Sequence, residues 1–188
     1  MTAKRKLRAL GLAGVLVLSS GWSALSMHSQ TTANSAPASP GILTRDQAAA
    51  IFPANVFFRG QTATTQTRNS SGVRLADGRL VLAAIVNTSG YSSGVAEAYQ
   101  AYLITEVPLN FGARVLKPGA YGFGFVTGDR MTIMDIGGAE VLSATTVHDT
   151  ELARPIPLQI LPEAAKFRLY LGRNYVSFAA APGSTRVP

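Results

Sequence analysis

The chain has 188 residues, no cysteine and a formal net charge of +7 at neutral pH. The absence of cysteine excludes a disulfide framework and a lipid anchor on cysteine. Four of the 17 Lys and Arg residues lie within the first eight positions, which leaves 13 cations against 10 anions, a net charge of +3, in the remainder. No basic run of five residues exists, so we expect no nucleic-acid partner.

The N-terminal residues 1–26 have the order of a secretory signal peptide. The basic start is followed by the uninterrupted apolar run Ala9–Leu18 and then by small residues, with Ala24 and Ser26 two positions apart. The apolar run is shorter than the roughly 20 residues that a membrane-spanning helix needs. We therefore predict export to the periplasm or the cell exterior. The alternative is an uncleaved segment that anchors the chain, the one case in which we expect membrane contact.

Residues 27–41 are predicted to be a disordered linker, because no side chain in residues 30–41 is large and apolar. The folded part is expected to span residues 42–188, which is long enough for one domain with its own core. Packing, and not disulfides, must stabilise this domain.

A short helix is predicted at the start of the domain, in the sequence TRDQAAAIF. Thr44 and Gln47 have the spacing of a capping box, in which the threonine oxygen accepts a hydrogen bond from an otherwise unpaired backbone N–H. Pro53 ends the helix because it disfavours the helical conformation at Phe52. No second helix is predicted.

Strands and turns are predicted for the remainder of the chain. The first hairpin is indicated by Asp77-Gly78 between apolar runs, which is typical of a two-residue turn. Its register places Leu75 opposite Leu80 and Val73 opposite Leu82. Residues 80–86 are apolar on both faces, which is typical of a central strand that is covered on both sides.

The segment LKPGAYGFGFV, residues 116–126, alternates glycines with aromatic residues. Its glycine order differs from the G-x-G-x-x-G of a dinucleotide-binding loop, and aromatic residues follow where that loop would open a helix. Pro118 and Gly119 predict a type II turn. In the strand that follows, alternation places Tyr121, Phe123 and Phe125 on one face and Gly122 and Gly124 on the other.

A candidate ligand-binding slot lies on the glycine face of this strand. A two-residue turn at Gly128-Asp129 would place Asp135 opposite Gly122, and a slip of one residue would move Asp135 to the other face. Glycine inside a strand often marks the close approach of a ligand or another backbone. We therefore interpret Gly122, Gly124 and Asp135 as candidate ligand-binding residues. The alternative is that neighbouring side chains fill the slot.

The turn from Leu116 to Tyr121, with the pattern Leu-x-Pro-Gly-x-Tyr, and the apolar strand to Val126 resemble an element of secreted bacterial β-sandwich domains. The similarity is to the carboxypeptidase-regulatory or prealbumin-like type and to uncharacterised exported families. It covers eleven of the 188 residues. The resemblance implies a non-catalytic sandwich, and it transfers no functional residue.

Further strands are predicted at residues 100–107 and 139–147 and in the last hairpin, FRLYLGRNYVSFA. This hairpin is predicted to turn around Arg173-Asn174, because asparagine tolerates the left-handed conformation. Its register places Leu171 opposite Val176 and Leu169 opposite Phe178, and it directs Arg168, Tyr170 and Ser177 away from that apolar face.

Turn signals recur about every 8–12 residues, which is typical of a sandwich or barrel. We therefore predict a single all-β domain, a sandwich or partly open barrel of about seven to nine antiparallel strands, preceded by one short helix.

Residues that could support catalysis or bind metal are sparse. The predicted domain has one histidine, His148, which lies near Asp149 and Glu151 in the sequence HDTE. This sequence lacks the spacing of known zinc motifs and fits a polar turn better. We expect neither a metal nor a cofactor. A hydrolase-like enzyme that uses His148 or a pair of carboxylates is the enzymatic alternative.

The preferred interpretation is an exported, non-enzymatic binding or interaction domain that acts through loops or a sheet edge. Its partner would be a small molecule, a glycan or an envelope protein. The loop TSGYSSG, residues 88–94, is a further candidate ligand-binding element and contributes Tyr91. Besides the hydrolase, the other alternative is an envelope-structural protein that is held by an uncleaved signal segment.

Overall fold

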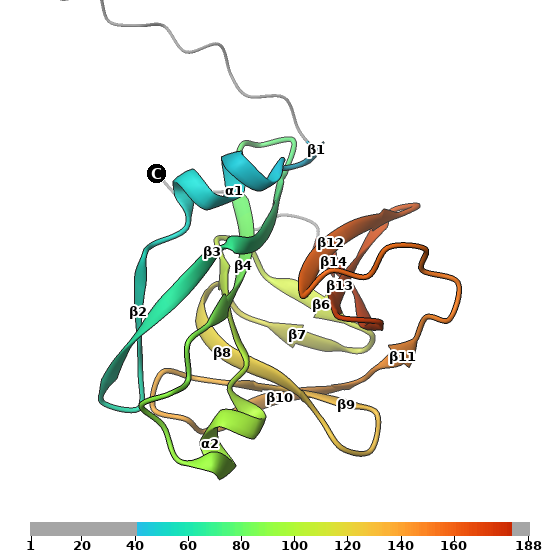
Figure 1. Ribbon diagram of the computed structural model, residues 1–188. Helices are drawn as coiled ribbons and strands as arrows, with labels where there is room; N and C mark the ends of the chain where they lie inside the picture. Colours follow the sequence, from blue (N-terminus) through green and yellow to red (C-terminus); the bar gives the residue numbers. More distant parts are fainter. Residues whose placement is uncertain (1–40, 182–188) are drawn as a thin grey trace, which may run out of the picture. The chain divides into compact units, whose positions relative to one another are not determined.

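The computed structural model describes residues 41–181 (Figure 1), so the predicted signal peptide and almost all of the predicted linker lie outside the described residues. This part of the chain forms two antiparallel β-sheets and two short helices, which confirms the predicted all-β sandwich. Neither helix has the length and hydropathy that a membrane crossing requires.

The first sheet has eight strands in the order β1-β3-β4-β5-β8-β9-β10, and β2 also pairs with β3. These strands are β1 (Gly41–Ile42), β2 (Asn55–Phe58), β3 (Gln61–Arg74), β4 (Leu80–Val86), β5 (Ala101–Thr105), β8 (Gly119–Val126), β9 (Arg130–Met134) and β10 (Glu140–Thr145).

The second sheet has six strands in the order β12-β13-β14-β6-β7, and β11 also pairs with β14. They are β6 (Leu109–Phe111), β7 (Arg114–Leu116), β11 (Val147–His148), β12 (Leu158–Glu163), β13 (Lys166–Leu171) and β14 (Asn174–Ala180). Of the 14 strands in residues 41–181, nine have five residues or more, which is the upper limit of the predicted number.

The main core receives buried side chains from both sheets. Leu103 of β5 and Ile133 of β9 come from the first sheet, and Leu169 of β13 comes from the second. The two sheets are also joined by a hydrogen bond, because the backbone N–H of Ile160 donates to the Ser71 hydroxyl oxygen at 3.0 Å. Burial of these rows of apolar side chains is the dominant stabilising term for a fold without disulfides.

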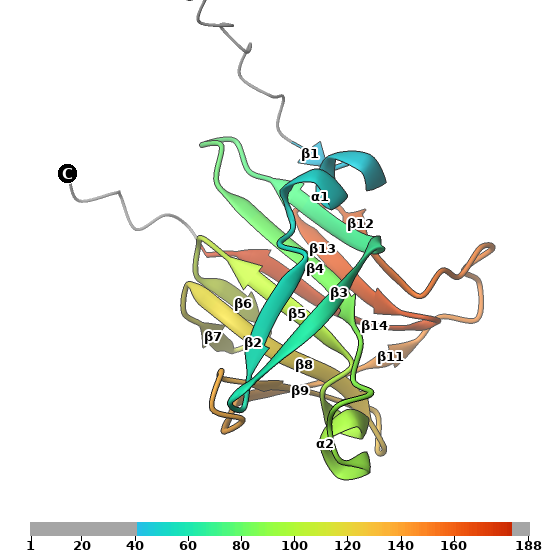
Figure 2. The ribbon, with the colours of Figure 1, turned by 60° about the vertical axis from the view of Figure 1, so that its left-hand side comes forward.

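A smaller second core covers the other face of the first sheet. Leu82, Ala84 and Val86 of β4 point into it, while Val81 and Ala83 point into the main core, so β4 is central and covered on both sides as predicted. Figure 2 shows β2 and β3 crossing in front of β5 and β8.

Helix α1 (Arg45–Ile51) confirms the predicted capping box. Thr44 accepts from the backbone N–H of Gln47 at 3.3 Å, and the Gln47 side chain accepts from the backbone N–H of Thr44 at 2.9 Å. Helix α2 (Ser93–Ala98) was not predicted. Its sequence, SGVAEA, gives a weak helix signal, because glycine has a low helix propensity. In the structure Ser92 forms no side-chain cap and none of the six residues is buried.

Two predicted hairpin registers are wrong by one residue. In the first hairpin Val73 pairs with Val81, because the loop has three residues and not two. The Leu75 N–H donates to the Arg79 carbonyl oxygen, and the Gly78 N–H donates to the Leu75 carbonyl oxygen. Gly78 alone takes the positive φ angle that ends such a three-residue loop. The slip moves Val73 and Leu82 to opposite faces of the sheet.

The hairpin of β8 and β9 shows the same slip, since Val126 pairs with Arg130 around a three-residue loop. The last hairpin turns instead at Gly172-Arg173, so Leu169 pairs with Val176. This register differs from the predicted one by two residues, and a slip of two keeps every side chain on its predicted face.

Candidate functional site

The space over the two glycines of the predicted slot is filled from within the chain. A Cβ atom on Gly122 would lie 2.7 Å from the Phe58 ring and 2.8 Å from the Tyr99 ring. A Cβ atom on Gly124 would clash with the carbonyl oxygen of Ala98 at the end of α2. These contacts correspond to the alternative that neighbouring groups fill the slot, and they account for both glycines by packing.

Asp135 does not lie opposite Gly122, which corrects the register on which the slot depended. Gly122 pairs with Met134, and Asp135 begins the turn after β9. Its Oδ1 accepts hydrogen bonds at 2.9 Å from the backbone N–H groups of Gly137 and Ala139. Its charge also raises the pKa of Tyr121, on the opposite face from the glycines, although burial of Tyr121 is the larger cause.

Tyr91 belongs to an aromatic group that covers Gly122. The Tyr91 hydroxyl donates to the Phe58 carbonyl oxygen at 3.0 Å, and its ring meets the Tyr99 ring edge-on at 5.3 Å between centroids. The Tyr99 and Phe58 rings stack at 3.9 Å. Two predicted residues, Gly122 and Tyr91, therefore lie at this aromatic group, while Gly124 packs against the end of α2 and Asp135 lies in the turn after β9.

The predicted polar sequence HDTE is divided between two environments. His148 is exposed, and its Nδ1 lies 2.7 Å from the Asn174 Oδ1 across the β11–β14 pair. Within residues 41–181, no group of three His, Asp or Glu side chains is arranged to hold a metal ion. Asp149 instead enters a polar network on the second sheet.

We call this network the Arg168 cluster; it consists of Asp149, Glu163, Arg168, Tyr170, Tyr175 and Ser177. Strands β12, β13 and β14 and the residue after β11 contribute its members. Their neighbours Leu169 and Val176 point into the main core, so alternation directs the cluster to the outer face of the second sheet. The predicted hairpin had already placed Arg168, Tyr170 and Ser177 on this face.

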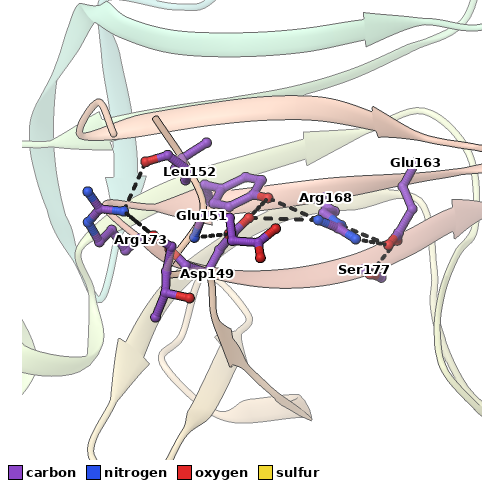
Figure 3. Close-up of polar contacts among 9 residues, drawn as sticks. Asp149, Glu151, Leu152, Glu163, Arg168, Arg173 and Ser177 are labelled. Atoms are coloured by element: carbon purple, nitrogen blue, oxygen red, sulfur yellow. Dashed lines mark hydrogen bonds and ion pairs between the residues drawn. The ribbon is translucent and has the colours of Figure 1, made fainter. Parts of the chain in front are cut away.

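Arg168 lies between the two carboxylates of the cluster (Figure 3). On one side its Nε and Nη2 contact Glu163 Oε1 at 2.7 and 2.6 Å. The other oxygen of Glu163 accepts from the Ser177 hydroxyl at 2.7 Å. The guanidinium carbon lies 4.5 Å from the centre of the Tyr175 ring, within the range of a cation–π interaction.

The contacts on the Asp149 side of Arg168 are longer. Its Nη1 lies 3.5 Å from the Tyr170 hydroxyl oxygen and 3.7 Å from Asp149 Oδ2. The Tyr170 hydroxyl donates to Asp149 Oδ2 at 2.8 Å. Arg168 is therefore bound firmly to Glu163 and loosely to Asp149.

The loop of residues 149–157 is held to the β13–β14 turn by Arg173. The Arg173 Nη1 donates to the carbonyl oxygens of Leu152, Asp149 and Thr150 at 2.9, 3.3 and 3.4 Å. The Asp149 N–H in turn donates to the Arg173 carbonyl oxygen at 2.9 Å. These bonds fix the position of Asp149 relative to Arg168.

Both carboxylates of the cluster are held in the ionised form. The hydrogen bond from Tyr170 lowers the pKa of Asp149, and those from Arg168 and Ser177 lower the pKa of Glu163. A general acid needs a carboxyl pKa raised toward neutrality, and neither group has one. The cluster offers fixed donors, acceptors and an aromatic ring, which is the chemistry of recognition.

Sequence reasoning missed this convergence, because it did not predict β12. The pattern of residues 158–163 contains the signal: Leu158 and Ile160 alternate with Gln159 and point into the core. This strand pairs with β13 and thereby brings Glu163 next to Arg168. The contact of Asp149 depends on the course of a loop, which alternation does not encode.

A shallow polar hollow over the irregular part of β3 is a weaker candidate site. It is lined by Thr65–Asn69, five residues of a single strand. Ligand sites usually combine groups from several elements. The Arg168 cluster meets that condition and the hollow does not.

Comparison of the chain with family models, with curated proteins and with solved structures finds no match. The geometry of the Arg168 cluster is therefore the basis for the proposed function.

Proposed function

We propose that the chain is an exported, non-enzymatic binding domain whose ligand-binding surface is the outer face of the second sheet, at the Arg168 cluster. The observation that carries this proposal is a set of preorganised groups in which Tyr170 is buried and the charged side chains are partly exposed. The side chains of Arg168, Glu163 and Asp149 are 33%, 29% and 16% exposed.

The location of the cluster supports a role in binding. The inward faces of β13 and β14 already supply apolar side chains to the core, so the fold does not need charges on their outer faces. The side chains of the cluster are instead hydrogen-bonded to one another, and most of them project from strands. Rigid support of this kind lowers the entropic cost of binding.

The proposal of a binding function is tested by a nuclear magnetic resonance titration with probes of different chemistry. The probes are cellotetraose, trialanine and inorganic phosphate, and the protein is the chain from residue 27 onward, which cleavage of the predicted signal peptide would leave. We expect at least one probe to shift the signals of Arg168, Tyr175 and Ser177 and to be recovered unchanged. Shifts confined to another surface, or cleavage of a probe, would contradict the proposal.

Export is tested separately with the full chain expressed in a bacterium. We expect the protein in the periplasm or the medium, with its N-terminus near residue 27, because residues 1–26 have the order of a cleaved signal peptide. A full-length chain in the membrane fraction would favour the anchored envelope protein instead.

A further inference from the structure

The hairpin of β2 and β3 forms an arm over the first sheet, and one edge of this arm is open. β2 pairs with β3 along one edge, and no strand among residues 41–181 pairs with its other edge. The Thr65 N–H donates to the Ala54 carbonyl oxygen at 2.9 Å. Alternation from this bond directs the backbone groups of Asn55 and Phe57 away from β3. Neither N–H forms a hydrogen bond within the described residues, so the edge can pair with one more strand.

The open edge lies over the outer face of the first sheet. The Tyr102 hydroxyl of β5 donates to the Phe57 carbonyl oxygen at 3.1 Å, which places β5 beneath this edge (Figure 2). Two residues further along β5, Ile104 pairs with Ala120 of β8, and both side chains are only partly buried at the border of the second core. An extended segment beside β2 would cover them, because alternate side chains of a strand point to one face.

We propose that this edge binds an extended, apolar segment of a partner protein, which joins the arm as a third strand. Main-chain hydrogen bonds to Asn55 and Phe57 hold the segment, and its inward side chains pack on Ile104 and Ala120. The Phe57 carbonyl oxygen has a second lone pair besides the one that accepts from Tyr102. The segment binds on the first sheet, so this inference is independent of the Arg168 cluster on the second.

The exposed side chains along the edge are also apolar. Phe57 is 52% exposed, and alternation with the buried Val56 and Phe58 points it away from the second core. Ile136 is 50% exposed and lies at the tip of the arm, where its carbonyl oxygen accepts from the Arg59 N–H at 2.7 Å. A third strand places its outward side chains next to Phe57, and pairs of aromatic and β-branched side chains stabilise a sheet. We therefore expect the segment to be apolar on both faces.

Arg59 indicates that the segment carries an acidic residue at one end. It follows β2 with a φ angle of 48°, and Gly60 follows with 80°, as in the two-residue type I′ turn. Asparagine and glycine adopt this conformation with less strain, so the turn itself does not require arginine. Arg59 is exposed and forms no ion pair within residues 41–181. Its charge is available to a carboxylate of the bound segment.

A second copy of the chain fits this edge less well. Two arms that join edge to edge in antiparallel order have their inner faces on the same side, and both first sheets then lie on that side. Because β5 already lies beneath the open edge, the two first sheets would collide. A single extended segment is thin enough to avoid this collision.

The inference is tested with a synthetic peptide and the chain from residue 27 onward. The peptide alternates three valines with three threonines and has an aspartate at each end, so that either direction of binding places one carboxylate near Arg59. We expect nuclear magnetic resonance to show binding. Hydrogen exchange of the Asn55 and Phe57 amides should slow by about tenfold or more at saturation, since both N–H groups become hydrogen-bonded.

Two matched peptides separate main-chain pairing from charge. The same sequence with every peptide nitrogen methylated cannot donate to a neighbouring strand, and it should bind at least about tenfold more weakly. The same sequence with lysine in place of each aspartate should bind about threefold more weakly or worse, because it brings a like charge to Arg59. Both peptides leave the protein unaltered.

Variants of the protein test the same two contributions. Asn55→Pro removes an outward N–H but none of the bonds between β2 and β3, so it should weaken binding by about tenfold or more. Asn55→Ala keeps the N–H and should bind as the unchanged protein does. Arg59→Asn keeps the turn and should abolish the preference for aspartate over lysine. Val115→Ser, at an exposed apolar residue of β7, is the control for nonspecific contact and should leave binding unchanged.

Four outcomes would overturn the inference. They are full binding in Asn55→Pro, shifts confined to residues away from β2, equal binding of the methylated peptide, and no binding of the aspartate peptide at millimolar concentration. Slow exchange at β2 that depends on protein concentration and needs no peptide would assign the edge to a second copy instead. None of these results would remove the Arg168 cluster as a binding surface, because the two surfaces lie on different sheets.

Discussion

Tyr99 shows at the level of single residues how the second core is assembled. Its ring is fully buried and fills the space over Gly122, but its hydroxyl has no hydrogen-bond partner among residues 41–181. Tyr102 lies in the same core, and its hydroxyl donates to the Phe57 carbonyl oxygen at 3.1 Å. Burial of a polar group without a partner costs free energy, whereas a satisfied hydroxyl contributes modestly to stability.

Tyr99→Phe and Tyr102→Phe should therefore have opposite effects on the free energy of unfolding. We expect Tyr99→Phe to raise it by up to about 1 kcal/mol and Tyr102→Phe to lower it by about 1 kcal/mol. Urea denaturation of both variants measures the difference. A loss of stability in Tyr99→Phe would show that its hydroxyl has a partner that this account lacks.

Gly124 allows the close packing of β8 against the end of α2. Gly124→Ala should lower the free energy of unfolding by more than about 2 kcal/mol, because the added methyl would overlap the Ala98 carbonyl. Gly94→Ala is the matched control, since a Cβ there meets nothing within 4 Å and alanine favours helix α2. Thermal unfolding of the two variants tests the packing explanation, which fails if Gly124→Ala is tolerated as well as Gly94→Ala.

Glu163 makes the stability depend on pH in a defined direction. The hydrogen bonds from Arg168 and Ser177 lower its pKa in the folded state, so its contribution is complete above the ordinary carboxyl pKa. That contribution is lost as the pH falls below about 4. Denaturation at several pH values should show a smaller acid-induced loss of stability in Glu163→Gln than in the unchanged protein. Equal losses would mean that the ion pair does not affect folding.

At the scale of elements, the hairpins show what sequence patterns determine. Alternation identified β4, β8 and β14 and their buried faces, because each buried face imposes a period of two. The loop lengths were not evident: Asp77-Gly78 and Gly128-Asp129 suggested two-residue turns, yet both hairpins close with three residues. The additional loop residue shifts the register of β9 by one, which moves Asp135 off the glycine face of β8. The predicted ligand slot required Asp135 on the glycine face.

The loop of residues 149–157 gives a prediction at this scale. Arg173→Ala should increase amide hydrogen exchange across the loop, since three carbonyl oxygens lose their donor. Arg154→Ala, an exposed substitution within the same loop, should leave exchange unchanged. Unchanged protection in Arg173→Ala would show that the loop is held by other contacts.

At the scale of the described domain, the sheets were predictable, but their outer coverings were not. The apolar rows of residues 80–86 required cover on both sides, and the structure supplies it with the second sheet on one face and with α1, β2 and Tyr99 on the other. The Arg168 cluster combines residues from distant parts of the sequence. The sequence alone does not indicate that Asp149 and Glu163 lie next to Arg168, because this proximity depends on how the strands pair.

The most direct test of the binding surface is a crystal structure of the domain grown with whichever of the three titration probes binds. We predict an intact probe on the outer face of the second sheet, in contact with the Arg168 cluster, and an unchanged aromatic group over Gly122. A probe that displaces Tyr91 and α2 to reach Gly122, with the Arg168 cluster unoccupied, would contradict the proposed binding surface.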